Sequence, residues 1–323
     1  MTYRSRLRLV HATSLLWLVA FVTYSITVGL PTKRSNVLLW MVLAIIAFGA
    51  GRPRRTFKSL LLDWSPIIVA LAAYDLLRGL SDDGAASAHT WPQLNFDRWL
   101  GGGVTPTVHL QGWLHETAVV RWYDYAAWGV YTSHFLLPLG IAVALQVVGS
   151  TRFRPYLYGL ALLSWMALLT YWLYPAKPPW MVGQEGLTDH VSRIVHGVWK
   201  HVGVERAARV YEPSKISGST YSNEVAALPS LHGGFPMFIF MMLRGVRPWL
   251  TALLGLYVVA MGATLVYAGE HFVFDILMGW AYAIAAALLV TWIFHHVRRQ
   301  RHEEIETWPE PDMDDVPRDP AVV

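Results

Sequence analysis

The sequence predicts an all-α polytopic membrane protein with about eight transmembrane helices. Of its 323 residues, 54% are hydrophobic and only 15% are charged, a combination that soluble domains rarely show. Apolar runs long enough to cross a hydrocarbon layer of about 30 Å recur along the chain. The sequence contains no cysteine, which excludes disulfides and thiolate metal sites.

Eight apolar runs account for the predicted spans, and they divide the chain into three parts. Residues 1–58 form N-terminal transmembrane spans, and residues 59–295 form a membrane domain with a six-helix bundle. Residues 296–323 form a disordered cytoplasmic tail, because this end is acidic and rich in proline. The first run is too long for the apolar core of a signal peptide. The runs are 9–30, 36–50, 59–78, 124–147, 155–174, 231–243, 248–268 and 272–295, of which the second and sixth are short for a full crossing.

Lysine and arginine in the short connections predict how the chain is oriented. With the N-terminus inside, fourteen of these residues face the cytoplasm, whereas the short outer connections contain only Lys33 and Arg34. We therefore predict an integral protein of the plasma membrane with both termini inside. The fourteen residues are Arg4, Arg6, Arg8, Arg52, Arg54, Arg55, Lys58, Arg152, Arg154, Arg244, Arg247, Arg298, Arg299 and Arg301.

Two long connections, at about 79–123 and 175–230, then lie outside. Both contain tryptophan, proline and amphipathic pieces, so we expect them to lie on the bilayer surface over a site that faces outward. The isoelectric point of about 9.2 does not indicate a nucleic-acid partner. The basic residues form short clusters between apolar runs, whereas nucleic-acid binding calls for a continuous basic surface.

The stretch ALPSLHGGF, residues 227–235, places polar groups at the outer end of a predicted span. Pro229 ends the preceding extended segment, and Ser230 caps the helix that follows. The backbone amides near Gly233 then point into one small volume, where the helix dipole adds positive potential and favours an anion. The simpler alternative is a helix start without a ligand, in which His232 is a hydrogen-bonded histidine at the membrane interface.

The stretch YAGEHFVFDILMGW supplies a second set of polar groups at the start of the last span. His271 and Asp275 are four residues apart, so on a helix they share one face. A carboxylate there takes the proton of one imidazole nitrogen and leaves the other as a lone pair. An aspartate this close to the bilayer core favours a functional role; a structural hydrogen bond between helix ends is the alternative. The sixth and eighth spans begin at the same membrane face, so we expect the two stretches to meet.

At these residues the chain resembles the type 2 phosphatidic acid phosphatase superfamily, and in particular its branch of inositol phosphorylceramide synthases. The matching pieces are PSLH at 229–232, HFVFD at 271–275 and YPAKPPW at 174–180, and the resemblance covers roughly residues 60–295. It implies a catalytic membrane domain that acts on a membrane lipid as phosphotransferase, with a lipid or another alcohol as acceptor. It implies no cofactor and no metal.

The resemblance also implies a role for each site residue. His271 would attack phosphorus and form a phosphohistidine, with Asp275 orienting its ring. His232 would protonate the leaving oxygen and then deprotonate the acceptor, which is water or an alcohol. The phosphate-binding residues would be Ser230, Gly233 and Lys177. For the lysine, an interfacial side chain without phosphate contact is the alternative.

The chain departs from the pattern of the superfamily's phosphatases at two places. These enzymes carry Arg-Pro seven and eight residues after the lysine, and Ser-Arg ahead of the second histidine. This chain has Gln184-Glu185 and Thr264-Leu265 there. A phosphate monoester is nearly a dianion at neutral pH and usually binds bidentate arginine, whereas a diester carries a single charge. The departures therefore favour a phosphodiester donor, unless basic residues of the long loop replace the missing ones. The candidates are Arg193, Arg206, Arg209 and Lys215.

Two other functions are compatible with the sequence. A lipid phosphate or polyprenyl pyrophosphate phosphatase would use the same residues with water as acceptor. A non-catalytic lipid transporter or scaffold would also place charges in the membrane, although the polar residues here gather at one face and form no stripe through the spans. His134, in the fourth span, is interpreted as structural.

Overall fold

The computed structural model describes residues 3–27, 34–49, 54–81, 88–116, 119–202 and 225–306. Within these ranges the chain forms thirteen helices and no strand, with three isolated β-bridges, so the predicted all-α class is confirmed. The helices are α1 (Tyr3–Thr27), α2 (Arg34–Gly49), α3 (Arg54–Ser81), α4 (Trp91–Leu100), α5 (Pro106–Leu114), α6 (Trp122–Ser133), α7 (Leu137–Val147), α8 (Phe153–Leu173), α9 (Pro179–Gln184), α10 (Ile194–His201), α12 (Leu231–Leu243), α13 (Pro248–Tyr267) and α14 (Val273–Glu306).

Three single helices of the described chain have the length and composition of a membrane span. These are α8, α13 and the Val273–Val297 part of α14. The helices α6 and α7, bent by 51° at the break between them, meet the same criteria only when taken together, as a broken span or a re-entrant loop. Three further apolar helices, Leu39–Gly49, Leu61–Ala73 and α12, are shorter. At 1.5 Å per residue, the 13 residues of α12 extend only about 20 Å. The apolar helices are those of an integral membrane protein, while the predicted count of eight spans stays a prediction.

The predicted fourth span, residues 124–147, is broken between α6 and α7. Pro138 lies in the first turn of α7, and proline has no N–H and clashes with the preceding helical turn, so one straight helix cannot run through it. The His134 N–H donates to the Tyr131 carbonyl oxygen at 3.2 Å, which tightens the last turn of α6. The break leaves His134 as the C-terminal cap of α6.

The helices α12 and α14 approach each other closely through glycine. A Cβ on Gly279 of α14 would lie 2.2 Å from the Ser230 carbonyl oxygen, and a Cβ on Gly234 of α12 would lie 3.1 Å from the Gly279 carbonyl oxygen. Glycine, which has no Cβ, permits this approach. The same two helices share a hydrophobic core with α8, in which Tyr156 and Phe238 are fully buried.

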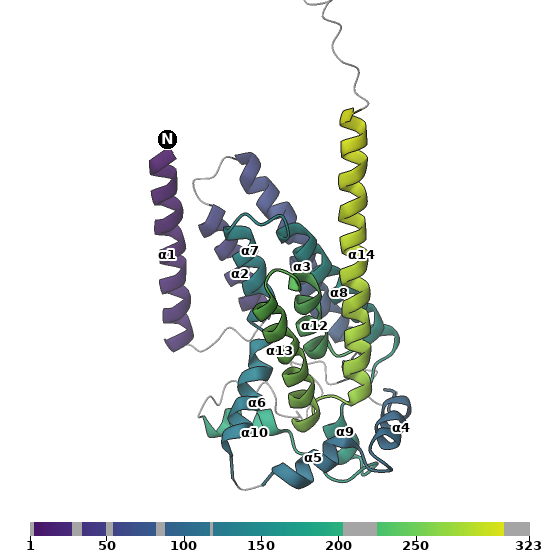
Figure 1. The fold of residues 1–323 in the computed structure, drawn as a ribbon. Helices are drawn as coiled ribbons and strands as arrows, with labels where there is room; N and C mark the ends of the chain where they lie inside the picture. Colours follow the sequence, from purple (N-terminus) through teal and green to yellow (C-terminus); the bar gives the residue numbers. More distant parts are fainter. Residues whose placement is uncertain are drawn as a thin grey trace, which may run out of the picture.

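Four short helices, α4, α5, α9 and α10, gather at the end of the bundle where α13 ends and α14 begins (Figure 1). They belong to the two connections that the sequence places outside. Extended segments of these connections pair with one another, because Ala176 bridges His89 on one side and Ala226 on the other. The Lys177 N–H also donates to the His89 carbonyl oxygen at 3.0 Å. We call the paired segments 88–90, 175–177 and 225–227 the ladder.

The last helix runs further than the predicted eighth span. It continues to Glu306, so the segment that was expected to be a disordered tail begins as helix, and residues 307–323 lie outside the described chain. The far end of α14 and the start of α1 lie at the same end of the bundle, opposite the short helices (Figure 1).

Gly279→Ala is expected to lower the stability of the detergent-solubilised protein, because the added Cβ would overlap the Ser230 carbonyl oxygen. Overpacking of this kind costs about 1–3 kcal/mol and should lower the midpoint of thermal unfolding. Gly255→Ala in α13 is the matched control, since a Cβ there meets the Phe240 ring at 3.7 Å, an ordinary contact. Equal midpoints for the two variants would contradict the close helix contact.

Candidate active site

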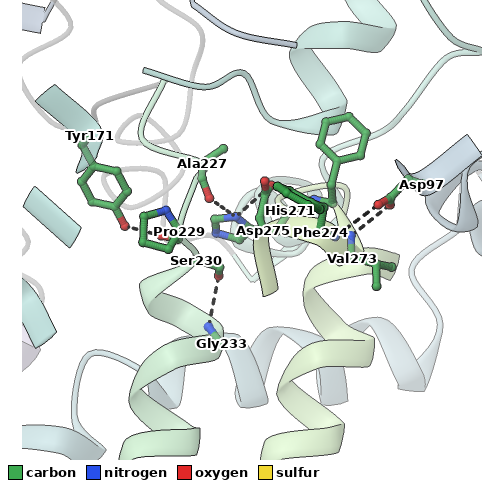
Figure 2. A network of polar contacts seen from close by, with 11 residues as sticks. Asp97, Tyr171, Ala227, Pro229, Ser230, Gly233, His271, Val273, Phe274 and Asp275 are labelled. Carbon is green, nitrogen blue, oxygen red and sulfur yellow. Dashed lines mark hydrogen bonds and ion pairs between the residues drawn. The ribbon is translucent and has the colours of Figure 1, made fainter. Parts of the chain in front are cut away.

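Ser230 is the N-cap of α12, and the start of this helix is bonded to both α8 and α14. Its side-chain oxygen accepts a hydrogen bond from the Gly233 N–H at 3.1 Å, as expected of an N-cap. Its own N–H donates to the Asp275 carbonyl oxygen at 3.0 Å, and the Tyr171 hydroxyl donates to the Pro229 carbonyl oxygen at 2.7 Å (Figure 2). These hydrogen bonds fix the position of the start of α12. The Gly233 N–H, which the sequence analysis predicts to bind phosphate, donates to Ser230 instead.

His271 lies in the turn before α14, and its ring is bonded to the backbone of another segment. Nδ1 lies 3.0 Å from the Ala227 carbonyl oxygen and 3.6 Å from Asp275 Oδ2. Because a carbonyl oxygen only accepts, Nδ1 carries the proton and Nε2 keeps a lone pair. The sequence predicts a proton held on one ring nitrogen by Asp275, whereas the nearer partner of Nδ1 is the Ala227 carbonyl oxygen.

Asp275 serves the first turn of α14 as well as the imidazole. The helix begins at Val273, after a turn at Gly269 with φ of 74°, so His271 and Asp275 do not share a helical face as predicted. Asp275 Oδ2 accepts from the Phe272 N–H at 2.9 Å, which is the return half of a capping box. The other carboxylate oxygen, Oδ1, is buried and has no hydrogen-bond partner within the described chain.

His232, in the first turn of α12, lies beside His271. The centroids of the two rings are 5.5 Å apart, and their planes are inclined by 50°. Nε2 of His232 is buried, and the described residues offer it no hydrogen-bond partner. An unpaired buried nitrogen is costly unless a ligand or a water molecule completes it. The structure thus brings the two predicted stretches together around a place suited to a polar group.

His134, at the break between α6 and α7, packs directly on His232. The ring centroids lie 4.0 Å apart at 28°, and the His134 ring also stacks on Phe235 at 5.0 Å. Tyr131 of α6 stacks on His232 as well, at 4.7 Å. The sequence predicts a structural role for His134 and no place at the site. The sequence signal for a place at the site was a histidine within a predicted span, four residues before Pro138.

A model of the PAP2 superfamily matches residues 93–289, which is more than half of the chain. The chain belongs to the PAP2 superfamily. Members of this superfamily are typically phosphatases or phosphotransferases that act on lipid phosphates. The match includes both histidines and Asp275, and the resemblance inferred from the motifs is confirmed.

A curated relative of this PAP2 protein is a phosphoinositol dihydroceramide synthase from Bacteroides thetaiotaomicron. The two chains are 26% identical over 278 residues, which cover 81% of this chain and 84% of the relative. No solved structure matches the chain.

Two cations that the sequence proposed as phosphate ligands of this PAP2 protein are paired with carboxylates. Lys177 Nζ lies 2.7 Å from Glu185 Oε1, so Glu185 offsets the charge of Lys177. Glu185 stands at the position where the superfamily's phosphatases have the proline of Arg-Pro. The Arg193 guanidinium meets both carboxylate oxygens of Glu270 at 3.2 Å and covers the Trp180 ring at 4.4 Å. Arg206, Arg209 and Lys215 lie outside the described residues. In the described part of the chain, no three His, Cys, Asp or Glu side chains are grouped to hold a metal ion.

Asp97 of α4 caps the start of α14 from another segment (Figure 2), a contact that the sequence analysis missed. Its Oδ2 accepts from the Val273 N–H at 2.9 Å and its Oδ1 from the Phe274 N–H at 3.2 Å. The side chain is fully buried. This burial raises the pKa of Asp97 to about 6, and the nearby Asp275 carboxylate adds to the rise. The only sequence signal was an acid among aromatic residues in FDRWL.

Asp97→Asn is expected to remove a pH dependence of stability. Folded Asp97 has a pKa of about 6 instead of the ordinary 3.8, so its contribution to stability falls as pH rises between these values and is constant above them. At about 1.4 kcal/mol per pKa unit, the fall is at most on the order of 3 kcal/mol. The measurement is the thermal midpoint of both proteins between about pH 4 and pH 7. The wild-type midpoint should fall relative to that of the variant, and parallel curves would count against this assignment.

Proposed function

We propose that this protein is a membrane lipid phosphotransferase that moves a phosphoryl head group from a lipid phosphodiester to an alcohol through a phosphohistidine. The observation that supports it best is the pairing of His271 with His232. One imidazole has its proton held at Nδ1 by the Ala227 carbonyl oxygen at 3.0 Å. The second lies at a centroid distance of 5.5 Å, and its Nε2 has no hydrogen-bond partner among the described residues. A nucleophile beside a general acid is what a two-step transfer requires.

In the first step, Nε2 of His271 attacks phosphorus, and the bond from phosphorus to the oxygen of the lipid alcohol breaks. His232 gives its proton to that leaving oxygen. The phosphorylated imidazole is cationic, and the Asp275 carboxylate, 3.6 Å from Nδ1, stabilises the charge. The positive end of the α12 dipole and the Ser230 hydroxyl favour the non-bridging oxygens.

In the second step, the acceptor hydroxyl takes the place of the departed lipid alcohol. His232, now neutral, removes the hydroxyl proton while the oxygen attacks phosphorus and the phosphorus–nitrogen bond breaks. His271 is restored, and the head group is joined to the acceptor. With water as acceptor, the same step would be hydrolysis.

The charges around the site support a diester donor. Glu185 offsets Lys177, and Glu270 offsets Arg193, so these two cations leave little excess positive charge for a phosphate dianion. A diester carries one negative charge and needs less compensation. The relative's name, phosphoinositol dihydroceramide synthase, supports an inositol-containing head group and a ceramide-like acceptor.

We also propose the membrane arrangement that the sequence predicts. It has eight spans, residues 1–58 as N-terminal spans ahead of a catalytic domain at 59–295, both termini in the cytoplasm, and the site at the extracytoplasmic face of the plasma membrane. In support, the start of α1 and the far end of α14 lie at one end of the bundle, whereas the short helices that surround the site lie at the other (Figure 1).

The decisive experiment is covalent labelling by a diester lipid whose phosphorus is radioactive. The purified wild type should acquire an acid-labile, base-stable label, and His271→Gln should acquire none. His232→Gln should turn over about 10²- to 10⁴-fold more slowly, the usual contribution of a general acid. His296→Gln is the control, because this exposed histidine lies near the far end of α14. A label on a residue other than His271, or phosphate release from monoesters without any transfer, would overturn the proposal.

The stack on His232 makes a separate prediction for His134. His134→Phe keeps an aromatic ring against His232 and should keep turnover within a few-fold of wild type. His134→Ala removes the stack, which is worth about 0.5–1.5 kcal/mol, and should lower kcat by about 2- to 10-fold with KM unchanged. Steady-state transfer assays measure kcat and KM of both variants, after thermal unfolding has shown that their midpoints are equal. A larger loss for the phenylalanine variant would show that the imidazole nitrogen, and not the stack, is what matters.

A further inference from the structure

A cavity of about 390 Å³ lies beside the ladder, and its described lining contains both members of the Lys177–Glu185 pair. His89, Thr90 and Trp91 also line it. The volume is within the range of small-molecule sites, roughly 300–1,000 Å³. The roles proposed for the two catalytic histidines make no use of this cavity.

The ladder sets the distance between the cavity and the nucleophile. His89 pairs with Ala176, and Ala176 pairs with Ala226, the residue before the Ala227 carbonyl that holds His271. Paired extended segments lie about 4.8 Å apart. The cavity wall at His89 is therefore about two such spacings, roughly 10 Å, from the segment that holds the nucleophile. The segment that carries Lys177 also contacts the turn before His271, because the Trp180 N–H donates to the Gly269 carbonyl oxygen at 3.2 Å. The cavity and the turn that carries His271 are therefore neighbours.

The charges in the cavity are balanced. The Lys177 side chain is 12% exposed and its Nζ lies 2.7 Å from Glu185 Oε1, so an ammonium and a carboxylate face the same space with no excess of either sign. A phosphate group would have to compete with Glu185 for Lys177, and it would meet repulsion from the carboxylate. A neutral ligand avoids this cost.

The lining offers hydrogen-bond donors and acceptors together. Lys177 donates, the Glu185 carboxylate accepts, and the hydroxyl of buried Thr90 can do both. His89 stacks flat on Tyr174, with ring centroids 3.8 Å apart, which leaves the edge of its imidazole for polar contacts. Trp91, 55% exposed, adds an apolar surface. Hydroxyl groups both donate and accept, so a ring with many hydroxyls on an apolar carbon frame matches this set.

We propose that the cavity binds the uncharged, polyhydroxylated part of the donor head group, a cyclitol or a sugar alcohol, while its phosphorus lies at His271. This inference rests on the proposed function and adds the location and chemistry of head-group selection. It assigns Lys177 to hydroxyl groups of the head group, together with Glu185, in place of the non-bridging phosphate oxygens.

The kinetic test compares two diester donors with the same lipid chains, phosphatidylinositol and phosphatidylmethanol. Glu185→Gln keeps the shape of the side chain but removes the charged acceptor. It should lower kcat/KM for phosphatidylinositol about 10- to 100-fold, the range for losing a hydrogen bond to a charged group, and change phosphatidylmethanol turnover less than about 3-fold. Glu116→Gln is the matched control, since Glu116 also forms a 2.7 Å ion pair, with Arg121, but does not line the cavity. Equal losses on both donors would overturn the inference and leave the phosphotransferase proposal standing.

A binding test decides the inference without turnover. Saturation-transfer NMR with free myo-inositol is recorded on detergent-solubilised wild type, on inactive His271→Gln and on Glu185→Gln. The signal should be present in the first two, lost in the third, and unaffected by inorganic phosphate. Absence of signal in wild type, or its loss on adding phosphate, would overturn the inference. A different result would contradict the proposed function itself: wild type that turns over neither phosphatidylinositol nor phosphatidylmethanol.

Discussion

The contact between the first turns of α12 and α14 is the constraint on which the rest of the site depends. The Ser230 N–H donates to the Asp275 carbonyl oxygen at 3.0 Å, and the missing side chain of Gly279 lets the two backbones approach. This contact sets the separation of His232 and His271. It also places two helix N-termini at one point, where their dipoles favour negative charge. The carboxylates of Asp97 and Asp275 accept hydrogen bonds from the N–H groups at the start of α14.

Backbone groups of the long connections hold the ring of His271. The Ala227 carbonyl oxygen holds the proton of His271 at Nδ1, and the ladder holds Ala227 in place through its N–H bond to Ala176 at 3.3 Å. The two long connections therefore do more than cover the site. They determine the tautomer of the histidine, and they form the cavity that we assign to the head group.

Charge pairing is the physical basis of the diester donor that we propose. Within the described chain, Lys177 and Arg193 each meet a carboxylate, and Glu185 occupies a position at which related phosphatases have proline after arginine. An ion pair presents donors and acceptors without net charge. In our proposal, the same pairing weakens the attraction for a dianion and offers partners to hydroxyl groups.

The sequence alone determined what is encoded within a few residues. Hydropathy showed the helical membrane class, Pro229 and Ser230 marked the start of α12, and the two histidine motifs indicated the superfamily. Only the tertiary structure decided which partners these groups have. Asp97 reaches a helix that begins 176 residues later, and His134 meets His232 at the break before Pro138. His271 has the Ala227 carbonyl oxygen as a partner in addition to the nearby Asp275. A cap or an apolar run depends on neighbours in the chain, whereas these contacts depend on how helices and loops pack, which local pattern does not specify.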